Sequence, residues 1–311
     1  MRVAVYYNNR DIRIQEIPVP KIGPGELLMK VMACGICGSD VMEWYRVKKA
    51  PRVLGHEATG IIVQVGEGVE KYKVGDRIFA SHHVPCNQCR YCLSGHHTAC
   101  ETLHTTNFDP GGFSEYVRIP KINVERGVLK LPDNVSFEEG TFIEPLGCVV
   151  RGQRIAKVSE GKTVLVLGSG PSGLLHIQLA KNKKVEKVIA TDIDEYRLNA
   201  AEKFGADIVL NGGEDVPSLV KKFNKNRGAD VVIVCTGAPP VVQQAWKSVD
   251  KGGTILFFAV PPPNVQVTIP INDFWRNEIT VTTSYGAAPM DLVESLKLIK
   301  DRQINVKDMI T

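Results

Sequence analysis

The pattern of apolar and polar positions changes about halfway along the chain. Up to about residue 150, short runs in which the two kinds alternate lie between Gly/Pro turns, at residues 2–6, 27–33, 60–65 and 114–119. Alternation with a period of two is typical of strands that bury one face, because successive side chains point to opposite sides. Residues 1–150 are therefore predicted to form a domain rich in β-strands.

Continuous apolar runs replace this alternation beyond residue 151. They lie at residues 163–167, 187–192, 230–235, 254–259 and 278–284. Segments with helical spacing separate them, and an apolar run of this kind suits a strand that is buried on both faces. This order of elements favours an α/β domain at residues 151–286, a doubly wound parallel sheet covered by helices on both sides. A further helix is predicted at residues 289–300.

Composition places the chain among ordinary globular proteins. Its 311 residues are 43% hydrophobic and 23% charged, which is enough for two domains with separate cores. The net charge of +4 is too small to indicate a nucleic-acid-binding surface. The first residues lack the apolar core of a secretory signal, and no apolar run is long enough to span a membrane. We expect a cytoplasmic protein that binds neither nucleic acid nor membrane.

Four cysteines stand close together in a polar, turn-rich stretch. Cys86, Cys89, Cys92 and Cys100 have the spacing C-x2-C-x2-C-x7-C. Four thiolates packed so closely suit one tetrahedral Zn2+ with no open position, which is typical of a structural site. Disulfides would need an oxidising compartment, which nothing else in the sequence indicates. The sequence therefore predicts a structural zinc lobe at about residues 85–101.

A glycine-rich turn joins the apolar run 163–167 to a helical segment. It contains Gly168, Gly170, Pro171, Ser172 and Gly173. Between a strand and a helix, the spacing G-x-G-x-x-G is typical of dinucleotide sites, because the glycines let the helix N-terminus approach a pyrophosphate closely. A plain tight turn is the alternative. The sequence therefore predicts that this half of the chain binds a nicotinamide cofactor.

Two residues near the end of the next strand bear on the choice of cofactor. Asp192 ends the run 187–192, where an acidic side chain accepts hydrogen bonds from the ribose hydroxyls and repels a 2'-phosphate. We therefore expect NAD rather than NADP. Arg197, a turn into the following helix, could meet such a phosphate and keeps NADP as the alternative.

Three residues that are far apart in the sequence suggest the hypothesis of a second zinc site. Cys37 follows the run 27–33, His56 stands in the motif GHE, and Glu144 lies where the two halves meet. Thiolate, imidazole and carboxylate together would form an asymmetric zinc site with room for water or a substrate. Taken singly, each residue has an ordinary interpretation: a buried thiol, a hydrogen-bonded histidine and a charge at a helix N-terminus.

The order of the motifs closely resembles that of one enzyme family. The motifs are CGICGSD (34–40), GHE (55–57), GVEKYKVGDRI (68–78), the four-cysteine lobe, GGFSEYV (111–117), EP (144–145) and GSGPSG (168–173). Over nearly the whole chain they are similar to the zinc-containing medium-chain alcohol, polyol and threonine dehydrogenases. The resemblance implies a GroES-like catalytic domain at residues 1–150 and a Rossmann NAD-binding domain at residues 151–286.

The resemblance also implies a role for each matching residue. The ligands of a catalytic zinc would be Cys37, His56, Glu144 and, as an exchanging or water-bridged ligand, Glu57. Ser39 matches the hydroxyl that takes the substrate proton, and Asp40 matches the group that orients the site. With the structural lobe, this makes two zinc ions per chain. A homo-oligomer is implied as well, with a tetramer favoured over a dimer.

Several positions depart from the family pattern. Met42 replaces a histidine that passes the proton to solvent in many relatives, so the relay runs through Ser39 and the ribose to water, or another group replaces it. Ser284–Tyr285 lacks an arginine found in sugar-alcohol members, which weakens a strict sorbitol interpretation. Glu144 stands where simple alcohol dehydrogenases tend to have cysteine, which favours polyol-type enzymes. Cys148 is expected to be a buried thiol rather than a competing ligand.

We therefore expect zinc-dependent, NAD-linked oxidation of a secondary alcohol such as a polyol or sugar alcohol. L-Threonine 3-dehydrogenase and a general secondary-alcohol dehydrogenase are the alternatives within the family. A non-catalytic, zinc-lobed NAD-binding protein is the alternative from another class. Residues 287–311 are expected to begin a return to the catalytic domain that is cut short by truncation.

Overall fold

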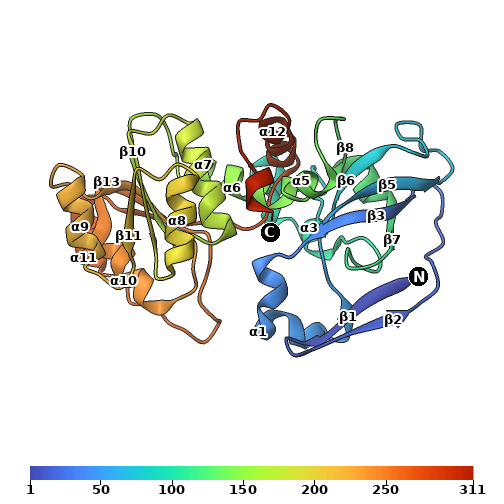
Figure 1. Ribbon diagram of the computed structural model, residues 1–311, viewed down its shortest axis with the longest axis horizontal. Helices are drawn as coiled ribbons and strands as arrows, with labels where there is room; N and C mark the ends of the chain where they lie inside the picture. The colour runs from blue at the N-terminus through green and yellow to red at the C-terminus, as the bar shows by residue number, and fades with distance from the viewer. Residues whose placement is uncertain (311) are drawn as a thin grey trace. The chain divides into compact units, whose positions relative to one another are not determined.

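Residues 1–310 are described by the structure, a computed structural model, and they divide into two compact units (Figure 1). The first unit contains Met1–Gly147 and Ala287–Arg302, together with the residues from Val306 onward. The second unit contains Cys148–Gly286 and Gln303–Asn305. None of the helices within residues 1–310 is both long enough and apolar enough to cross a bilayer.

Two antiparallel sheets form the framework of the first unit. In the described residues, the larger sheet has the order β7 (Tyr116–Ile119), β3 (Leu27–Gly35), β5 (Glu57–Val65), β6 (Arg77–Ser81) and β8 (Val128–Lys130). The smaller sheet has the order β2 (Asp11–Glu16), β1 (Arg2–Asn8) and β4 (Arg52–Val53). Leu27, Ile62 and Ile78 belong to the buried cluster that joins the central strands of the larger sheet. The first half is therefore rich in strands, as the alternating pattern predicts.

The helices of the first unit are short, apart from α12. They are η1 (Gly38–Val41), α1 (Glu43–Arg46), η2 (Val47–Lys49), α2 (Arg90–Leu93), η3 (His97–Ala99), α3 (Glu101–Thr105), α4 (Lys121–Gly127), α5 (Phe137–Thr141), α12 (Pro289–Lys300) and η4 (Lys307–Met309). Helix α6 (Ile143–Ile155) begins in this unit and ends in the second.

A parallel sheet forms the centre of the second unit. Its strands, over the described residues, are ordered β11 (Ile208–Asn211), β10 (Lys187–Asp192), β9 (Thr163–Leu167), β12 (Ala229–Val234), β13 (Val249–Phe257) and β14 (Thr280–Thr283). The helices between them are α7 (Pro171–Asn182), α8 (Glu195–Lys203), α9 (Val216–Phe223), α10 (Pro239–Ser248) and α11 (Ile271–Asn277). The order of the chain reverses between β9 and β12, and the carboxyl ends of the strands at such a point form the nucleotide site of doubly wound sheets.

Alternate residues of each buried strand face opposite layers of helices. Val164 of β9 belongs to the same core as Ile177 of α7. Its neighbour Leu165 belongs to a second core that contains Val242 of α10. An apolar run is needed in such a strand because both of its faces are covered. The predicted parallel sheet with helices on both faces is therefore confirmed.

Candidate metal sites and cofactor loop

Two strands of the first unit bring three candidate zinc ligands together. Cys37 lies two residues beyond β3 and caps η1, His56 immediately precedes β5, and Glu57 opens that strand. Gly35 of β3 is paired with Glu57, so the register of the two strands brings the motifs together. The ligand atoms of Cys37, His56 and Glu57 all lie within 4.8 Å of one another.

The buried charges of this group favour a bound cation. His56 is 9% exposed and Glu57 is 7% exposed. Burial and the negative charge of Glu144 raise the pKa of Glu57 to about 8. Burial by itself would lower the pKa of His56, but hydrogen bonds with Asp40 and Cys37 raise it well above its usual value. A divalent cation would stabilise the ionised carboxylates and thiolate that burial disfavours, so this donor set fits zinc.

Glu144 lies near the group but outside it. The residue stands in the first turn of α6 and is 9% exposed. Its charge raises the pKa of both His56 and Glu57, which places the carboxylate in their neighbourhood. It is not one of the three residues whose ligand atoms meet within 4.8 Å, so its role as a ligand stays a prediction. Cys148, one turn further along α6, is a partly buried thiol.

Asp40 ties the candidate ligands to the loop that follows Cys37. Its Oδ1 lies 3.5 Å from Nδ1 of His56, and its Oδ2 accepts the backbone N–H of Cys37 at 3.1 Å. The backbone N–H of Ser39 donates to Sγ of Cys37 at 3.4 Å. A carboxylate on one ring nitrogen fixes the orientation of the imidazole and leaves the other nitrogen for a metal. The structure thus brings both Ser39 and Asp40 to the predicted site.

Two further neighbours of the site had not been predicted. The guanidinium of Arg46 donates to Oγ of Ser39 at 2.7 Å and to Oδ1 of Asp40 at 3.1 Å. The ring of His82 lies 4.7 Å from that of His56, and burial lowers the pKa of His82 well below its usual value, which keeps it neutral. The sequence contains no signal for Arg46, because η1 and α1 are separated at Met42, whose backbone is not helical. His82 follows β6 without any such signal.

Glycine at position 35 leaves the space that the Glu57 carboxylate occupies. A Cβ atom on Gly35 would lie 2.1 Å from Oε2 of Glu57, which is far closer than two non-bonded atoms can approach. The glycine of the CGICGSD motif that faces β5 is therefore required by a side chain from the neighbouring strand.

The four-cysteine lobe is a local structure. Cys89 caps α2 and Cys100 caps α3. The Sγ atoms of Cys89 and Cys92 are 3.5 Å apart, those of Cys86 and Cys92 are 4.0 Å apart, and all four ligand atoms lie within 4.8 Å. Burial and hydrogen bonds with the neighbouring cysteines raise the pKa of Cys92 to about 12. Four sulfurs in this arrangement fit one tetrahedral zinc, and none of the eight cysteines within residues 1–310 forms a disulfide.

The glycine loop connects β9 to α7. Gly168 has a φ of +98°, which glycine adopts without strain. Gly170 precedes Pro171, the first residue of α7, and a Cβ atom on Gly170 would meet open space. A Cβ atom on Gly173 would lie 2.0 Å from the carbonyl oxygen of Gly168, so this glycine lets the helix pack against the loop. Open space beside a helix N-terminus fits the pyrophosphate of a dinucleotide.

Asp192 ends β10 beside this loop. Its Oδ2 accepts the backbone N–H of Ser169 at 2.8 Å, and its Oδ1 accepts those of Ile193 and Asp194 at 2.8 and 3.1 Å. Nη1 of Arg197 lies 3.8 Å from Oδ2, on a side chain that is 54% exposed, whereas that of Asp192 is 6% exposed. A carboxylate has about four lone-pair positions, so one remains for a ribose hydroxyl. The structure therefore brings both predicted residues together at the loop.

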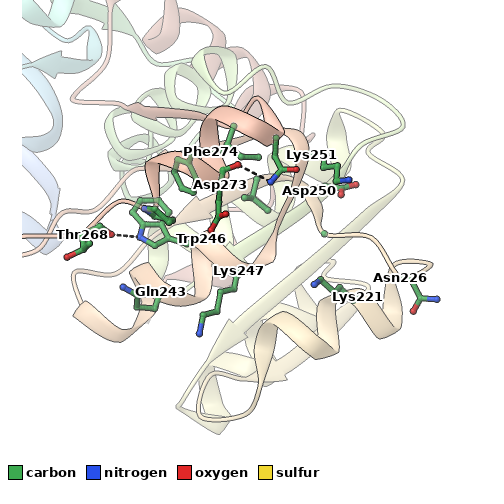
Figure 2. A pocket seen from close by; sticks show the side chains of 15 residues that line it. Lys221, Asn226, Gln243, Trp246, Lys247, Asp250, Lys251, Thr268, Asp273 and Phe274 are labelled. Carbon is green, nitrogen blue, oxygen red and sulfur yellow. Dashed lines mark hydrogen bonds between the residues drawn. The ribbon is translucent and has the colours of Figure 1, made fainter.

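A pocket of about 500 Å³ lies at the amino ends of the strands of the same sheet, opposite the end that carries the glycine loop (Figure 2). Gly228, Asp250 and Ile279 line it, at or near the amino ends of β12, β13 and β14. The indole N–H of Trp246, in its wall, donates to the carbonyl oxygen of Thr268 at 3.0 Å (Figure 2). The glycine loop follows the carboxyl end of β9, which runs parallel to β12, so the pocket is separate from the predicted cofactor site.

Known families match most of the chain. The alcohol dehydrogenase GroES-like domain matches residues 23–133, and the zinc-binding dehydrogenase family matches residues 171–301. Sorbitol dehydrogenase of Bacillus subtilis (strain 168) is 36% identical over 282 residues, which are 88% of this chain and 78% of the relative. L-Threonine 3-dehydrogenase of Pyrococcus furiosus is 34% identical over 95% of this chain and 86% of its own.

A solved structure agrees with these matches. A zinc-binding dehydrogenase from Sinorhizobium meliloti 1021, bound to NADP, has a TM-score of 0.89 and 29% identity over 100% of this chain and 91% of its own. The expected pairing of a GroES-like domain with a Rossmann domain is confirmed, and so is the expected family with its zinc and nicotinamide cofactor. The chain belongs to the zinc-containing medium-chain dehydrogenases, oxidoreductases that act on the CH–OH groups of their substrates.

Proposed function

We propose that this chain oxidises a secondary hydroxyl group of a polyol or sugar alcohol with NAD+ in a zinc-dependent reaction. The convergence of Cys37, His56 and Glu57 beside Ser39 and Asp40 carries the proposal. A protein that only bound NAD would have no use for an asymmetric group of metal ligands. The glycine loop then supplies the second requirement, a place for the hydride acceptor.

Two zinc ions are proposed for each chain. The catalytic zinc is assigned to Cys37, His56 and Glu144, with Glu57 as an exchanging ligand, and the structural zinc to the four-cysteine lobe. When bound, the catalytic zinc supplies a Lewis acid that lowers the pKa of a substrate hydroxyl group. The raised pKa of Glu57 supports this assignment, because two buried carboxylates near each other are stable as anions only beside a cation.

The chain's own residues position the substrate and move its proton. Ser39 accepts the proton of the substrate hydroxyl at Oγ, and Asp40 holds His56 in its orientation through Nδ1. A bound nicotinamide would supply the redox chemistry by accepting hydride from the carbon that bears this hydroxyl, so that the alcohol becomes a carbonyl compound. Met42 has no proton to exchange, so the proton leaves Ser39 by way of the cofactor ribose or another group.

Asp192 is proposed to select NAD over NADP. Its buried, anchored carboxylate lies where a 2'-phosphate would be repelled. The guanidinium of Arg197 lies near this carboxylate, which keeps it from a 2'-phosphate. NADP is the alternative cofactor, because a protein of similar fold binds it. Asp192→Ala should therefore reduce the ratio of kcat/KM for NAD to that for NADP by about tenfold or more. A native enzyme that already prefers NADP would refute the assignment and point to Arg197.

A homo-oligomer is also proposed, with a tetramer favoured over a dimer by the family resemblance. Two features of the second unit support an assembly. Strand β14 is the last strand of its sheet within residues 1–310, so one side of it has no paired strand. On the preceding helix, Trp275 is 76% exposed. Sedimentation velocity would give the assembly state.

L-Threonine oxidation is the second candidate. The threonine 3-dehydrogenase of Pyrococcus furiosus is nearly as similar to this chain as the sorbitol dehydrogenase of Bacillus subtilis is. Both substrates present a secondary hydroxyl group beside a second polar group, and the same zinc and serine can activate either. The side chains that border the substrate decide between them.

A substrate screen with metal analysis tests the proposed function. The zinc-loaded enzyme is assayed with polyols, L-threonine and simple secondary alcohols, each with NAD and NADP, by the absorbance of the reduced cofactor. Reduction of NAD by at least one polyol, with two zinc ions per chain, is the expected result. Absence of turnover with every alcohol, or one zinc per chain, would favour the non-catalytic zinc-lobed protein.

A further inference from the structure

We infer that Arg46 is a positioning residue of the proposed dehydrogenase, one that holds the Ser39 hydroxyl and the Asp40 carboxylate in a single fixed arrangement. The inference rests on the proposed function of this site. Neither the motifs nor the family resemblance assigns Arg46 a role.

Three hydrogen bonds join Arg46 to the loop after Cys37. Nη2 donates to Oγ of Ser39 at 2.7 Å and to Oδ1 of Asp40 at 3.1 Å, and Nε donates to the carbonyl oxygen of Ser39 at 2.9 Å. The side chain of Arg46 is 14% exposed and that of Asp40 is 4% exposed. Charge-assisted bonds that are largely removed from water are among the strongest in proteins.

The local helices explain how Arg46 reaches back. Ser39 and Asp40 lie in η1, Arg46 ends α1, and the backbone N–H of Arg46 is bonded to the carbonyl oxygen of Met42. The backbone of Met42 between the two helices is not helical (φ −78°, ψ 86°), so the chain turns there and the side chain of Arg46 reaches back to η1. The guanidinium also lies 4.8 Å from the ring centroid of Tyr45, which limits its freedom to swing away.

At Ser39, the contact decides how the hydroxyl is used. A hydroxyl group has one donor and two acceptor positions, and a guanidinium can only donate. With one acceptor position occupied by Arg46, the other remains for the proton of the substrate, and the O–H is left to pass a proton onward. Arg46 cannot itself relay a proton, since its guanidinium stays protonated in proteins. It therefore orients the first step of a relay in which Met42 takes no part.

At Asp40, the contact reaches a proposed metal ligand. Oδ1 is shared between Nη2 of Arg46 and Nδ1 of His56, and Oδ2 is fixed by the backbone N–H of Cys37. Without Arg46, the buried carboxylate would lose its guanidinium partner and could turn away from the imidazole. One side chain thus couples the proton acceptor to the orientation of His56.

The geometry requires arginine rather than any cation. The planar guanidinium presents two nitrogens to three oxygens, whereas the ammonium of lysine is a point charge on a flexible chain. Arg46→Lys should therefore restore only part of the activity that Arg46→Met loses.

Arg46→Met and Arg46→Lys are compared with the control Arg52→Met, which removes a neighbouring charge that takes no part in the bonds to Ser39 or Asp40. We expect Arg46→Met to lower kcat by about 10- to 100-fold, the scale of one or two charge-assisted hydrogen bonds. The KM for NAD and the zinc content should stay near their native values, whereas the melting temperature should fall, so kcat is taken per folded molecule. In the Ser39→Ala background, Arg46→Met should cost less activity than in the native enzyme, because the contact with Ser39 is already lost and only that with Asp40 remains.

Two further readouts separate positioning from a purely structural role. Added guanidinium chloride at millimolar concentration should raise the kcat of Arg46→Ala. Cobalt(II) in the catalytic site should show a changed visible spectrum in Arg46→Met, since the orientation of His56 changes, and this holds whatever the substrate is.

An unchanged kcat in Arg46→Met would overturn the inference. So would a loss of kcat in Arg46→Ala that follows the zinc content or the folded fraction and is not restored by guanidinium. A native enzyme that oxidises no alcohol contradicts the proposed function instead, and an unchanged cobalt spectrum in Arg46→Met would then dismiss the role of Arg46 as well.

Discussion

The two candidate zinc sites of the first unit are assembled in different ways. In the lobe, the outermost cysteines are 14 positions apart, and the short helices α2, η3 and α3 hold the sulfurs. The catalytic group needs the pairing of β3 with β5, and Glu144 lies 107 positions after Cys37. A closed set of four thiolates leaves no coordination position for a substrate. A mixed set of ligands can leave one open, and residues such as Asp40 orient its ligands by hydrogen bonds. The comparison predicts that damage to the lobe reduces stability and damage to the other group reduces turnover.

The largest effect is expected at the catalytic group. His56→Ala removes the imidazole from Cys37 and Glu57 and should lower kcat by about a thousandfold or more, beyond the loss of a single electrostatic contact. The Kd for NADH, measured by fluorescence, should change little, because the glycine loop belongs to the second unit. The control His96→Ala alters an exposed histidine in the lobe that is not one of its ligands, and it should leave kcat nearly unchanged. Normal turnover in His56→Ala would show that the catalytic zinc is wrongly assigned.

Damage to the lobe should give the opposite result. Cys89→Ser removes one of four sulfurs from a closed set whose metal affinity is part of the folding free energy. The melting temperature should fall by on the order of 10 °C, while turnover per folded molecule stays close to native. Ser94→Ala, an exposed change in the same lobe, should shift it far less. Lost turnover in fully folded Cys89→Ser would remove the distinction between the two sites.

A third change tests whether the pairing of β3 with β5 determines the position of the Glu57 carboxylate in the catalytic group. Gly35→Ala puts a methyl group where Oε2 of Glu57 lies, so the carboxylate must move. Zinc affinity of the catalytic group should fall by about 10- to 100-fold, as for other losses of ligand support, while the lobe keeps its metal. Gly38→Ala is the matched control, because a Cβ atom there meets nothing within 4 Å. Equal zinc affinities for the two variants would contradict this account of Gly35.

The smallest expected effect is a pH dependence of the metal-free protein. The pKa of Glu57 is raised from 4.5 to about 8, so the folded chain holds a proton there that the unfolded chain loses above about pH 5. The free energy of unfolding should therefore fall as pH rises from about 5 to about 8. The contribution of Glu57 is the difference between the native chain and Glu57→Gln, measured by chemical denaturation after chelation. Identical pH slopes for the two proteins would show that Glu57 is not strained by burial.

How much the sequence could predict follows from the range of the interactions. The residues predicted as strands at 163–167 and 187–192, and as a helix at 289–300, are those of β9, β10 and α12, because buried apolar runs and turn residues are local signals. Strand β13 begins at Val249, five residues before the predicted run, since its first part is polar and held by pairing with β12.

The residues of the candidate site also differ in whether local sequence or long-range contacts determine them. Motif spacing identified the cysteines of the lobe, the glycine loop and the residues of CGICGSD and GHE. Arg46 and His82 remained hidden, because their contacts with Ser39, Asp40 and His56 depend on how the chain folds back. The steric demand on Gly35 was equally invisible, since the carboxylate that it accommodates comes from another strand.

The compact spacing of the lobe cysteines would allow the lobe to bind its metal early in synthesis. All four sulfurs leave the ribosome within a short segment, before β8 and α6 have been made. They can capture zinc at that stage, because binding and local folding are one event there. With Glu144 as the proposed further ligand, the catalytic group would be complete only after Glu144 has emerged, because Glu144 follows the lobe in the chain. Zinc supply would therefore act on the nascent chain twice, first on whether it folds and later on whether it can turn over substrate.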